Sequence, residues 1–273
     1  MYRVGYLLHH KFFLKKGEPL KHAQLVIVGS YRIGGAGKTP LCKWLAKELC
    51  SKSEKVAVLC HSAAQDEFAL LREALPSCTV IATGNRYRTA HEVDNEFDFI
   101  ICDDGFEDSR LGFASAICLE WEAEPKKLSD MFPAGFARSF PQDHPNIKLR
   151  LRCSGENPDI QFSILEILNA QGIAPKNDNG IVLVAGIGDP GRFFRDVEST
   201  GLPIKGKLRL RDHSTNTESV VASLLAKGEQ VATTEKDACR LSEKTRSNEN
   251  LFIAKQRVYV SPATRQEILA LFK

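Results

Sequence analysis

A glycine-rich segment between an apolar run and a helix-like stretch constrains this chain most. The segment, Gly34-Gly35-Ala36-Gly37-Lys38-Thr39, follows the apolar run Leu25–Val28 and precedes a stretch that extends from Pro40 to Cys50. Glycines let backbone N–H groups turn inward around phosphate oxygens, and a helix N-terminus adds the positive end of its dipole. The pattern therefore predicts a strand, a phosphate-binding loop and a helix.

Lys38 and Thr39 stand where a nucleotide triphosphate needs them. In such a loop the lysine reaches the β- and γ-phosphates, and the threonine hydroxyl binds Mg²⁺. The usual spacing asks for a glycine at position 32, where this chain has Arg32. A glycine-rich turn that merely precedes Lys-Thr is the alternative, but the flanking strand and helix favour nucleotide binding.

The composition is that of a soluble globular protein, with 43% hydrophobic and 26% charged residues in 273. A net charge of +3 gives no argument for a nucleic acid partner. No two of the eight cysteines form a C-x-x-C pair, and several lie in apolar runs, such as Cys102 and Cys118. We therefore expect buried free thiols in a reducing compartment, not zinc ligands or disulfides.

Residues 1–16 are basic and rich in aromatic and aliphatic side chains, and they contain no acid. This composition suits a helix lying on an anionic membrane surface. The apolar residues spread nearly all round the helix, however, so a helix packed on the body of the protein is the alternative. No signal peptide is visible and no apolar run approaches the roughly 20 residues of a membrane span, which places the protein on the cytosolic side.

Short apolar runs alternate with longer helical stretches, which predicts an α/β fold with parallel strands joined by helices. The expected strands are Leu25–Val28, Lys55–Cys60, Thr79–Thr83, Phe97–Cys102, Ala116–Leu119, Ile181–Ala185, Ile204–Leu210, Gln230–Thr233 and Leu251–Ala254. The expected helices are Pro40–Cys50, Asp66–Leu75, Arg192–Thr200, Thr217–Ala226 and Pro262–Phe272. An irregular segment, Pro133 to Leu151, separates the two series. We expect two α/β lobes, residues 1–155 and 156–273, with a ligand-binding cleft between them and with the C-terminal helix able to pack on the first.

The run from Phe97 to Gly105 is an apolar strand that ends in two carboxylates, Asp103 and Asp104, and a glycine. In phosphate-loop proteins an acid at the end of a neighbouring strand faces the Mg²⁺ on the phosphates. Asp-Asp-Gly alone is more often a turn, but beside the glycine loop it favours a metal site. One of the two carboxylates is enough to touch the metal.

Three polar groups follow strands in the second series, and each has a structural alternative. Asp189-Pro190 precedes a helix and is typical of a simple strand-to-helix connection. Asp212-His213 is a loop pair that says little by itself. The segment that begins at Thr234 is more typical of a helix cap than of a nucleotide contact.

Taken together, these motifs resemble tetraacyldisaccharide 4'-kinases, the inner-membrane enzymes that phosphorylate the lipid A precursor. The resemblance extends from about residue 25 to 241 and rests on the glycine loop with Pro40, Asp103-Asp104-Gly105, Pro133-Ala134-Gly135, Ala185-Gly186-Ile187-Gly188-Asp189-Pro190, Asp212-His213 and Thr234-Glu235-Lys236-Asp237-Ala238.

The resemblance implies a two-lobed P-loop kinase that uses ATP and Mg²⁺, with residues 1–16 as a peripheral helix on the cytoplasmic face of the inner membrane. We expect a monomer with an acylated glucosamine disaccharide as substrate and no nucleic acid partner. The implied roles fall on the catalytic residues Lys38, Asp66 as base and His213 as its partner; on Gly34, Gly35, Ala36, Gly37, Lys38, Thr39 and Pro40 for the nucleotide; on Arg86 for the substrate; and on Thr39, Asp103 and Asp104 for the metal.

The chain departs from the family pattern mostly on the acceptor side. Cys60–Ala64 stands where the family has Ser-Arg-Gly-Tyr-Gly, and Phe106-Glu107-Asp108 replaces an aliphatic residue, Gln and His. Ser139 follows Arg138 where the family has an acid. A non-catalytic nucleotide-binding relative, or a kinase for a different, soluble acceptor, are therefore the alternatives to a lipid A 4'-kinase.

Overall fold

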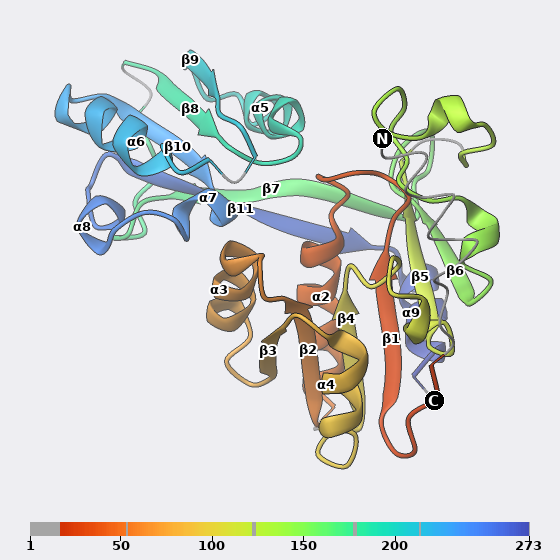
Figure 1. The fold of residues 1–273 in the computed structure, drawn as a ribbon. Helices are drawn as coiled ribbons and strands as arrows, with labels where there is room; N and C mark the ends of the chain where they lie inside the picture. Colours follow the sequence, from red (N-terminus) through yellow and green to blue (C-terminus); the bar gives the residue numbers. More distant parts are fainter. Residues whose placement is uncertain (1–16, 53, 122–123, 177–178, 213, 273) are drawn as a thin grey trace. The chain divides into compact units, whose positions relative to one another are not determined.

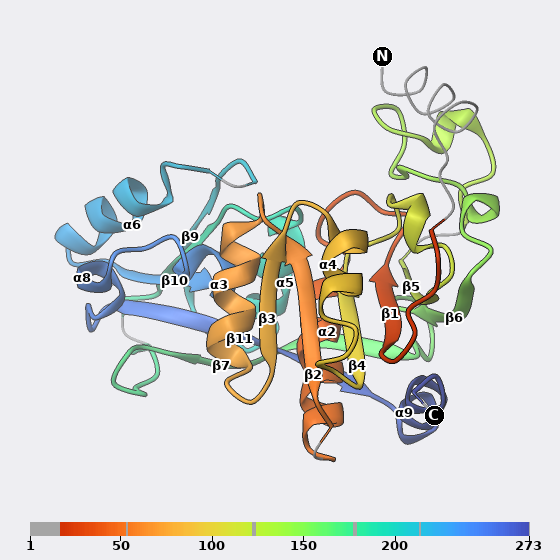
Figure 2. The same cartoon turned by 60° about the horizontal axis from the view of Figure 1, so that its bottom comes forward.

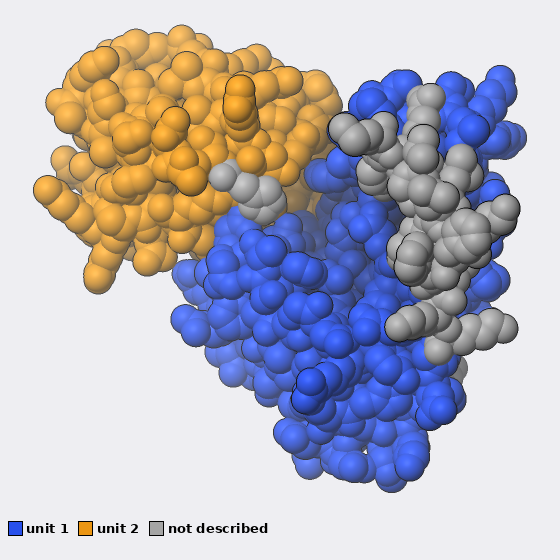
Figure 3. All heavy atoms as spheres, in the orientation of Figure 1, with its two compact units in different colours: residues 1–161, 258–273 blue, residues 162–257 orange. Residues whose placement is uncertain are grey.

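The computed structural model describes residues 17–52, 54–121, 124–176, 179–212 and 214–272. The chain forms two compact units: unit 1 comprises residues up to 161 together with 258–273, and unit 2 comprises residues 162–257 (Figure 3). The predicted helix in residues 1–16 lies outside the described residues. In the described parts of the chain, no helix has the length and apolar character needed to cross a bilayer.

Unit 1 is built on a six-stranded sheet in the order β3-β2-β4-β1-β5-β6, and every adjacent pair is parallel (Figure 1). Its strands are β1 (Gln24–Gly29), β2 (Val56–His61), β3 (Thr79–Thr83), β4 (Phe99–Asp103), β5 (Ser115–Glu120) and β6 (Ile147–Arg152). Its helical segments are α2 (Lys38–Cys50), α3 (Gln65–Ala74), α4 (Arg86–Glu92), α9 (Pro262–Ala270) and the short 3₁₀ turns η1 (Ser109–Leu111), η2 (Leu128–Asp130) and η3 (Pro141–Asp143). The predicted parallel sheet flanked by helices is confirmed.

The strand order determines which face each helix covers. Parallel crossovers are right-handed, so a connection that moves toward β3 and one that moves back toward β6 cover opposite faces. Figure 2 accordingly shows α2 and α4 on opposite sides of the sheet. On the α4 face, alternate strand residues such as Ile27 and Cys102 form a buried cluster with Ala90 of α4 and Leu111 of η1.

The C-terminal helix α9 belongs to unit 1. Arg265 donates from Nε to Glu48 of α2 at 2.9 Å, and the ring of Phe272 meets Phe99 edge-on with centroids 5.3 Å apart. The Gln24 side chain donates to the carbonyl of Leu271. The last residues of the chain are thus tied to the first strand and the first described helix.

Unit 2 has a five-stranded sheet in the order β7-β11-β10-β8-β9, in which β9, β8, β10 and β11 are parallel. Its strands are β7 (Ile160–Leu168), β8 (Ile181–Ala185), β9 (Ile204–Arg209), β10 (Gln230–Thr234) and β11 (Leu251–Val260). The first two residues of β7 and the last three of β11 belong to unit 1. Its helices are α5 (Pro190–Glu198), α6 (Thr217–Ala226), α7 (Glu235–Ala238) and α8 (Glu243–Arg246). Two apolar clusters are buried in it, one containing Phe193, Phe194 and Val197 of α5 and the other containing Val221 of α6.

Three expectations about local structure are wrong. The segment predicted to be irregular up to Leu151 contains β6 from Ile147 onward. Strand β7 and helix α4 were not expected at all. Cys50 and Cys78 form a disulfide, with their Cα atoms 6.7 Å apart, where free thiols were expected.

The disulfide follows from the fold. A β-α-β connection returns the chain to the edge where parallel strands begin. This brings Cys50 at the end of α2 close to Cys78, just before β3. The remaining cysteines are free, and those that are buried as expected are Cys42, Cys60, Cys102, Cys118 and Cys153.

Candidate active site

The glycine loop has the geometry of an anion site. Gly34, Gly35 and Gly37 have φ values of 64°, 58° and 84°, a left-handed conformation that favours glycine. Gly37 is the N-cap of α2, and no side chain caps this helix. The first N–H groups of α2, from Lys38 onward, are therefore available to a phosphate group.

Two segments from elsewhere in unit 1 hold this loop. Arg32 forms an antiparallel β-bridge with Ala137, and the backbone N–H of Arg138 donates to the carbonyl of Tyr31 at 3.0 Å. Trp121, which follows β5, donates from Nε1 to the carbonyl of Ala36 at 2.8 Å. The loop is thus fixed at its start and in its middle by residues about 85 to 105 positions away in sequence.

Asp103 sits at the end of β4 beside the end of β1, in register with Val28. Its side chain is 2% exposed, and its Oδ2 accepts a hydrogen bond from the Thr39 hydroxyl at 2.7 Å. Its Oδ1 is buried and has no hydrogen-bond partner. Burial raises the pKa of Asp103 to about 7, the negative charge of Glu67 adds to the rise, and the bond from Thr39 opposes it.

Asp104 has a different environment, although it is the next residue. Its φ is 62°, so the chain turns sharply here and its side chain leaves the strand. Asp104 pairs with Lys38 at 3.3 Å and with Arg138, which also lies 3.4 Å from Glu107. Burial acts to raise the pKa of Asp104, but the cations of Lys38 and Arg138 outweigh it and hold that pKa below its ordinary value.

The donor set at Asp103 fits a magnesium ion that arrives with a nucleotide. In the described parts of the chain, no group of three or more His, Cys, Asp or Glu side chains is arranged to hold a metal. Mg²⁺ needs no such cage, since it usually binds one or two carboxylates, phosphate oxygens and water. The Thr39 hydroxyl, the unpartnered Oδ1 of Asp103 and the nearby carboxylate of Glu67 supply oxygens of this kind.

The residues expected on the acceptor side lie on two helix starts of unit 1. Asp66 is in the first turn of α3, is 7% exposed and accepts from the N–H of Glu67 at 2.9 Å. Arg86 is the first residue of α4 and donates to the carbonyl of Asp103 at 3.1 Å. Arg86 therefore contacts the strand end that carries the two carboxylates. The negative charge of Glu67, which follows Asp66, raises the pKa of Asp103 at the same strand end.

His213, the expected partner of Asp66, lies outside the described residues. The other polar motifs of unit 2 make structural contacts. The side chain of Asp189 caps α5 by accepting from the N–H of Arg192, and Thr234 caps α7 by accepting from the N–H of Asp237. The capping role expected for Thr234 is confirmed.

Asp237 links two strand ends of unit 2. It is fully buried, accepts from the N–H of Gly186 at 3.1 Å and from the hydroxyl of Thr234 at 2.7 Å, and pairs with Arg240 at 3.2 Å. Arg240 also donates to the carbonyl of Gly186 at 3.1 Å. These bonds hold the turn after β8 against the start of α7.

Sequence reasoning missed three residues of the unit 1 site. Glu67 was passed over although it follows Asp66 directly, and Arg138 was noted only for the acid missing beside it. The position of Trp121 in the sequence could have identified it. Trp121 follows β5, which is parallel to β1, so both strands end at the same edge of the sheet and Trp121 is expected near the glycine loop that follows β1.

Comparison with known proteins identifies relatives over most of the chain. The family model of tetraacyldisaccharide-1-P 4'-kinase (LpxK) matches residues 60–273. The tetraacyldisaccharide 4'-kinase of Parvibaculum lavamentivorans is 30% identical, with 88% of this chain and 80% of the relative covered. That of Chlamydia trachomatis is 27% identical, with 86% and 76% covered.

Among solved structures, LpxK from Aquifex aeolicus in complex with ATP covers 100% of this chain and 95% of its own, with a TM-score of 0.69 and 20% identity. A likeness at this identity shows a common fold.

Proposed function

Because the chain belongs to the tetraacyldisaccharide-1-P 4'-kinase family, we propose that it transfers the γ-phosphate of ATP to the 4'-hydroxyl of a tetraacyldisaccharide 1-phosphate in lipid A biosynthesis. The observation that carries the proposal is the bond between Thr39 of the glycine loop and Asp103 at the end of the neighbouring strand. It joins the phosphate-binding element to a buried carboxylate that has one oxygen without a partner.

The glycine loop would bind the triphosphate. The open N–H groups at the start of α2 would accept phosphate oxygens, and Gly34, Gly35, Ala36 and Gly37 would let the backbone approach them. Lys38, now paired with Asp104, would turn to the β- and γ-phosphates while Arg138 continues to neutralise Asp104. Pro40 is the third residue of α2, within the first turn, where a backbone N–H has no partner inside the helix, so a proline is tolerated there.

Thr39, Asp103 and Glu67 would hold Mg²⁺, and Asp104 would stay paired with Arg138. When bound, the ion neutralises charge on the transferring phosphoryl group. Asp103 must lose its proton to serve as a ligand, so its raised pKa couples metal binding to proton release.

Asp66 would act as the base for the acceptor hydroxyl, with His213 as its partner. Phosphoryl transfer needs positioning and charge neutralisation more than covalent chemistry, so a buried carboxylate that accepts the proton late in the reaction is sufficient. The guanidinium of Arg86, held at the carbonyl of Asp103, would stand beside the reacting groups and contact the substrate.

We further propose that the protein works as a monomer on the cytoplasmic face of the inner membrane, where its lipid substrate is. The basic and aromatic composition of residues 1–16 supports this placement. Sedimentation with vesicles that contain anionic lipid would test it: replacing Lys15 and Lys16 by glutamate should weaken binding, whereas equal binding to zwitterionic vesicles would contradict it.

The catalytic proposal is tested by transfer of radiolabelled γ-phosphate from ATP to tetraacyldisaccharide 1-phosphate in detergent micelles. Label should appear in the lipid with the intact protein and be lost with Asp66→Asn, while ATP binding is retained. Asp159→Asn is the matched control, because Asp159 is a carboxylate of unit 1 whose bonds are to Arg152, outside the site.

The outcomes separate the alternatives. ATP binding without labelled lipid would indicate a non-catalytic relative or another acceptor. Label on a soluble acceptor, with no dependence on detergent, would indicate a kinase for that acceptor. A fully active Asp66→Asn variant would remove Asp66 as the base while leaving the kinase assignment intact.

A further inference from the structure

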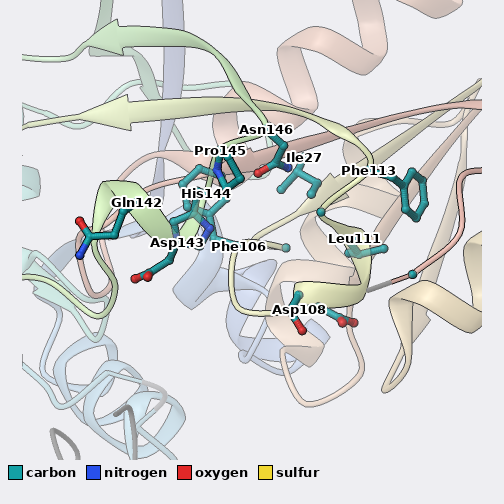
Figure 4. Close-up of a pocket in the computed structure, with 14 residues that line it drawn as sticks. Ile27, Phe106, Asp108, Leu111, Phe113, Gln142, Asp143, His144, Pro145 and Asn146 are labelled. Carbon is teal, nitrogen blue, oxygen red and sulfur yellow. The ribbon is translucent and has the colours of Figure 1, made fainter. Parts of the chain in front are cut away.

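Unit 1 contains a cavity of about 550 Å³, and its lining includes the residues that follow Asp103 and Asp104 in the sequence (Figure 4). Its walls come from Ile27 of β1, from the chain between Gly105 and Phe113, and from residues 142–146. This volume is within the range of about 300–1,000 Å³ in which proteins bind small molecules.

The cavity is suited to an apolar guest. Ile27, Phe106, Leu111, Phe113 and Pro145 line it (Figure 4), and no Lys or Arg is among its lining residues in the described part of the chain. A phosphate group or a nucleotide needs cations or open N–H groups, so the cavity is not built for either.

The acidic groups of the lining are already engaged. Asp108 pairs with Arg110 at 2.7 Å, and Asp143 accepts from the N–H of Phe140 at 2.8 Å. Burial raises the pKa of Asp143, and the hydrogen bond from Phe140 acts in the opposite direction. The two acidic side chains of the lining are therefore compatible with an acyl chain that passes them.

Phe106 of the cavity wall packs against the end of β1, beside the strand end that carries Asp103. The ring of Phe106 lies on Gly29 at the end of β1, so closely that a Cβ at Gly29 would be 2.1 Å from it. Phe106 also stacks with His144 at 4.5 Å between centroids, and His144 shares a hydrogen bond with Ser139 at 2.9 Å.

Only Gly105 separates Phe106 from Asp104, a span of about 7 Å at most. A long chain attached to the sugar that is being phosphorylated is therefore able to reach the cavity.

We propose that this cavity receives one acyl chain of the acceptor lipid and sets the chain length that the enzyme prefers. The proposal rests on the function proposed above, since that function supplies an acceptor with acyl chains. The half-buried ring of Phe113, which lies beside Tyr87, would form one end of the space that the acyl chain occupies. Ser109 of η1 would form a side wall of that space.

The test measures kcat/KM for acceptors whose acyl chains are shortened two methylenes at a time, in a fixed excess of detergent. With the intact protein, kcat/KM should fall about fourfold for each methylene withdrawn from the apolar cavity. Phe113→Ala enlarges the cavity and should move the optimum to longer chains. Ser109→Phe fills it and should move the optimum to shorter chains.

A merely structural effect would lower every rate together and leave the optimum in place. Phe97→Ala is the matched control, because Phe97 packs on the same apolar cluster as Phe113 but does not line the cavity. It should keep the optimum of the intact protein.

Two results would overturn the proposal: equal kcat/KM across chain lengths in the intact protein, or an unchanged optimum in both cavity variants while they remain active. Either leaves the kinase assignment untouched. Failure of the proposed function itself would appear instead as no labelled lipid with any acceptor, and a photoreactive acyl chain would then still report on the cavity by crosslinking to the segment Phe106–Phe113 or to residues 142–146.

Discussion

Replacing Asp103 by asparagine should remove a pH-dependent weakness from the metal-free protein. In the folded state Asp103 is buried beside Glu67, and its pKa rises from 3.8 to about 7. The folded protein thus binds this proton more tightly than the unfolded chain. The free energy of unfolding therefore falls as the pH rises through this window, and the loss is complete above the folded pKa.

The size of the effect follows from the shift. A rise from 3.8 to about 7 corresponds to about 4 kcal/mol in all, of which about 3 kcal/mol is lost between pH 5 and pH 8. Asparagine has the shape of the neutral acid and does not titrate. The variant should therefore be more stable than the natural protein by about 1 kcal/mol at pH 5 and by about 4 kcal/mol at pH 8.

Urea unfolding in the presence of a chelator, followed by tryptophan fluorescence, measures this difference. Both tryptophans of the chain, Trp44 and Trp121, lie in unit 1, so the signal reports on the unit that contains Asp103. Glu67→Gln lowers the pKa of Asp103 and should reduce the pH dependence without abolishing it. An equal stability difference between Asp103→Asn and the natural protein at both pH values would refute the reasoning.

Three further changes have defined outcomes. Lys38→Ala should lower transfer at least about a hundredfold while circular dichroism stays unchanged, because a cation at the developing charge is lost; near-normal turnover would contradict the role of the lysine. Trp121→Phe keeps an aromatic side chain, although a smaller one, but removes the donor to Ala36, so calorimetry should show ATP binding about 2- to 10-fold weaker; unchanged affinity would show that the bond does not shape the loop. Cys50→Ser opens the link to Cys78, whose 28-residue separation predicts a loss of about 3–4 kcal/mol in the free energy of unfolding; a reductant should have the same effect on the natural protein and none on the variant.

Local sequence determined the elements whose signals are contiguous. The glycine loop and α2 were predicted because their conformation depends on neighbouring residues: left-handed glycines followed by a helix start. Buried parallel strands such as β1 and β8 were found as short apolar runs. Strand β7 was missed because its side chains are buried only in part, and α4 was missed because seven residues carry little periodicity.

The tertiary structure decided how Asp103 and Asp104 differ in their partners and in their pKa values. The sequence offered two adjacent carboxylates and no means to rank them. In the fold, Asp103 ends the strand, and its buried side chain accepts a hydrogen bond from Thr39. Asp104 has a left-handed backbone conformation, and its own side chain pairs with Lys38 and Arg138. Desolvation raises one pKa and paired cations lower the other.

The sequence by itself thus determined that a phosphate loop and an acidic strand end are present in this chain. Only the tertiary structure brought Arg138 and Trp121, which are distant in sequence, to that strand end and that loop. It also formed the cavity that Phe106 lines. The physical reason is that backbone conformation depends on adjacent residues, whereas burial, charge pairing and cavity shape depend on residues that meet only after the chain has folded.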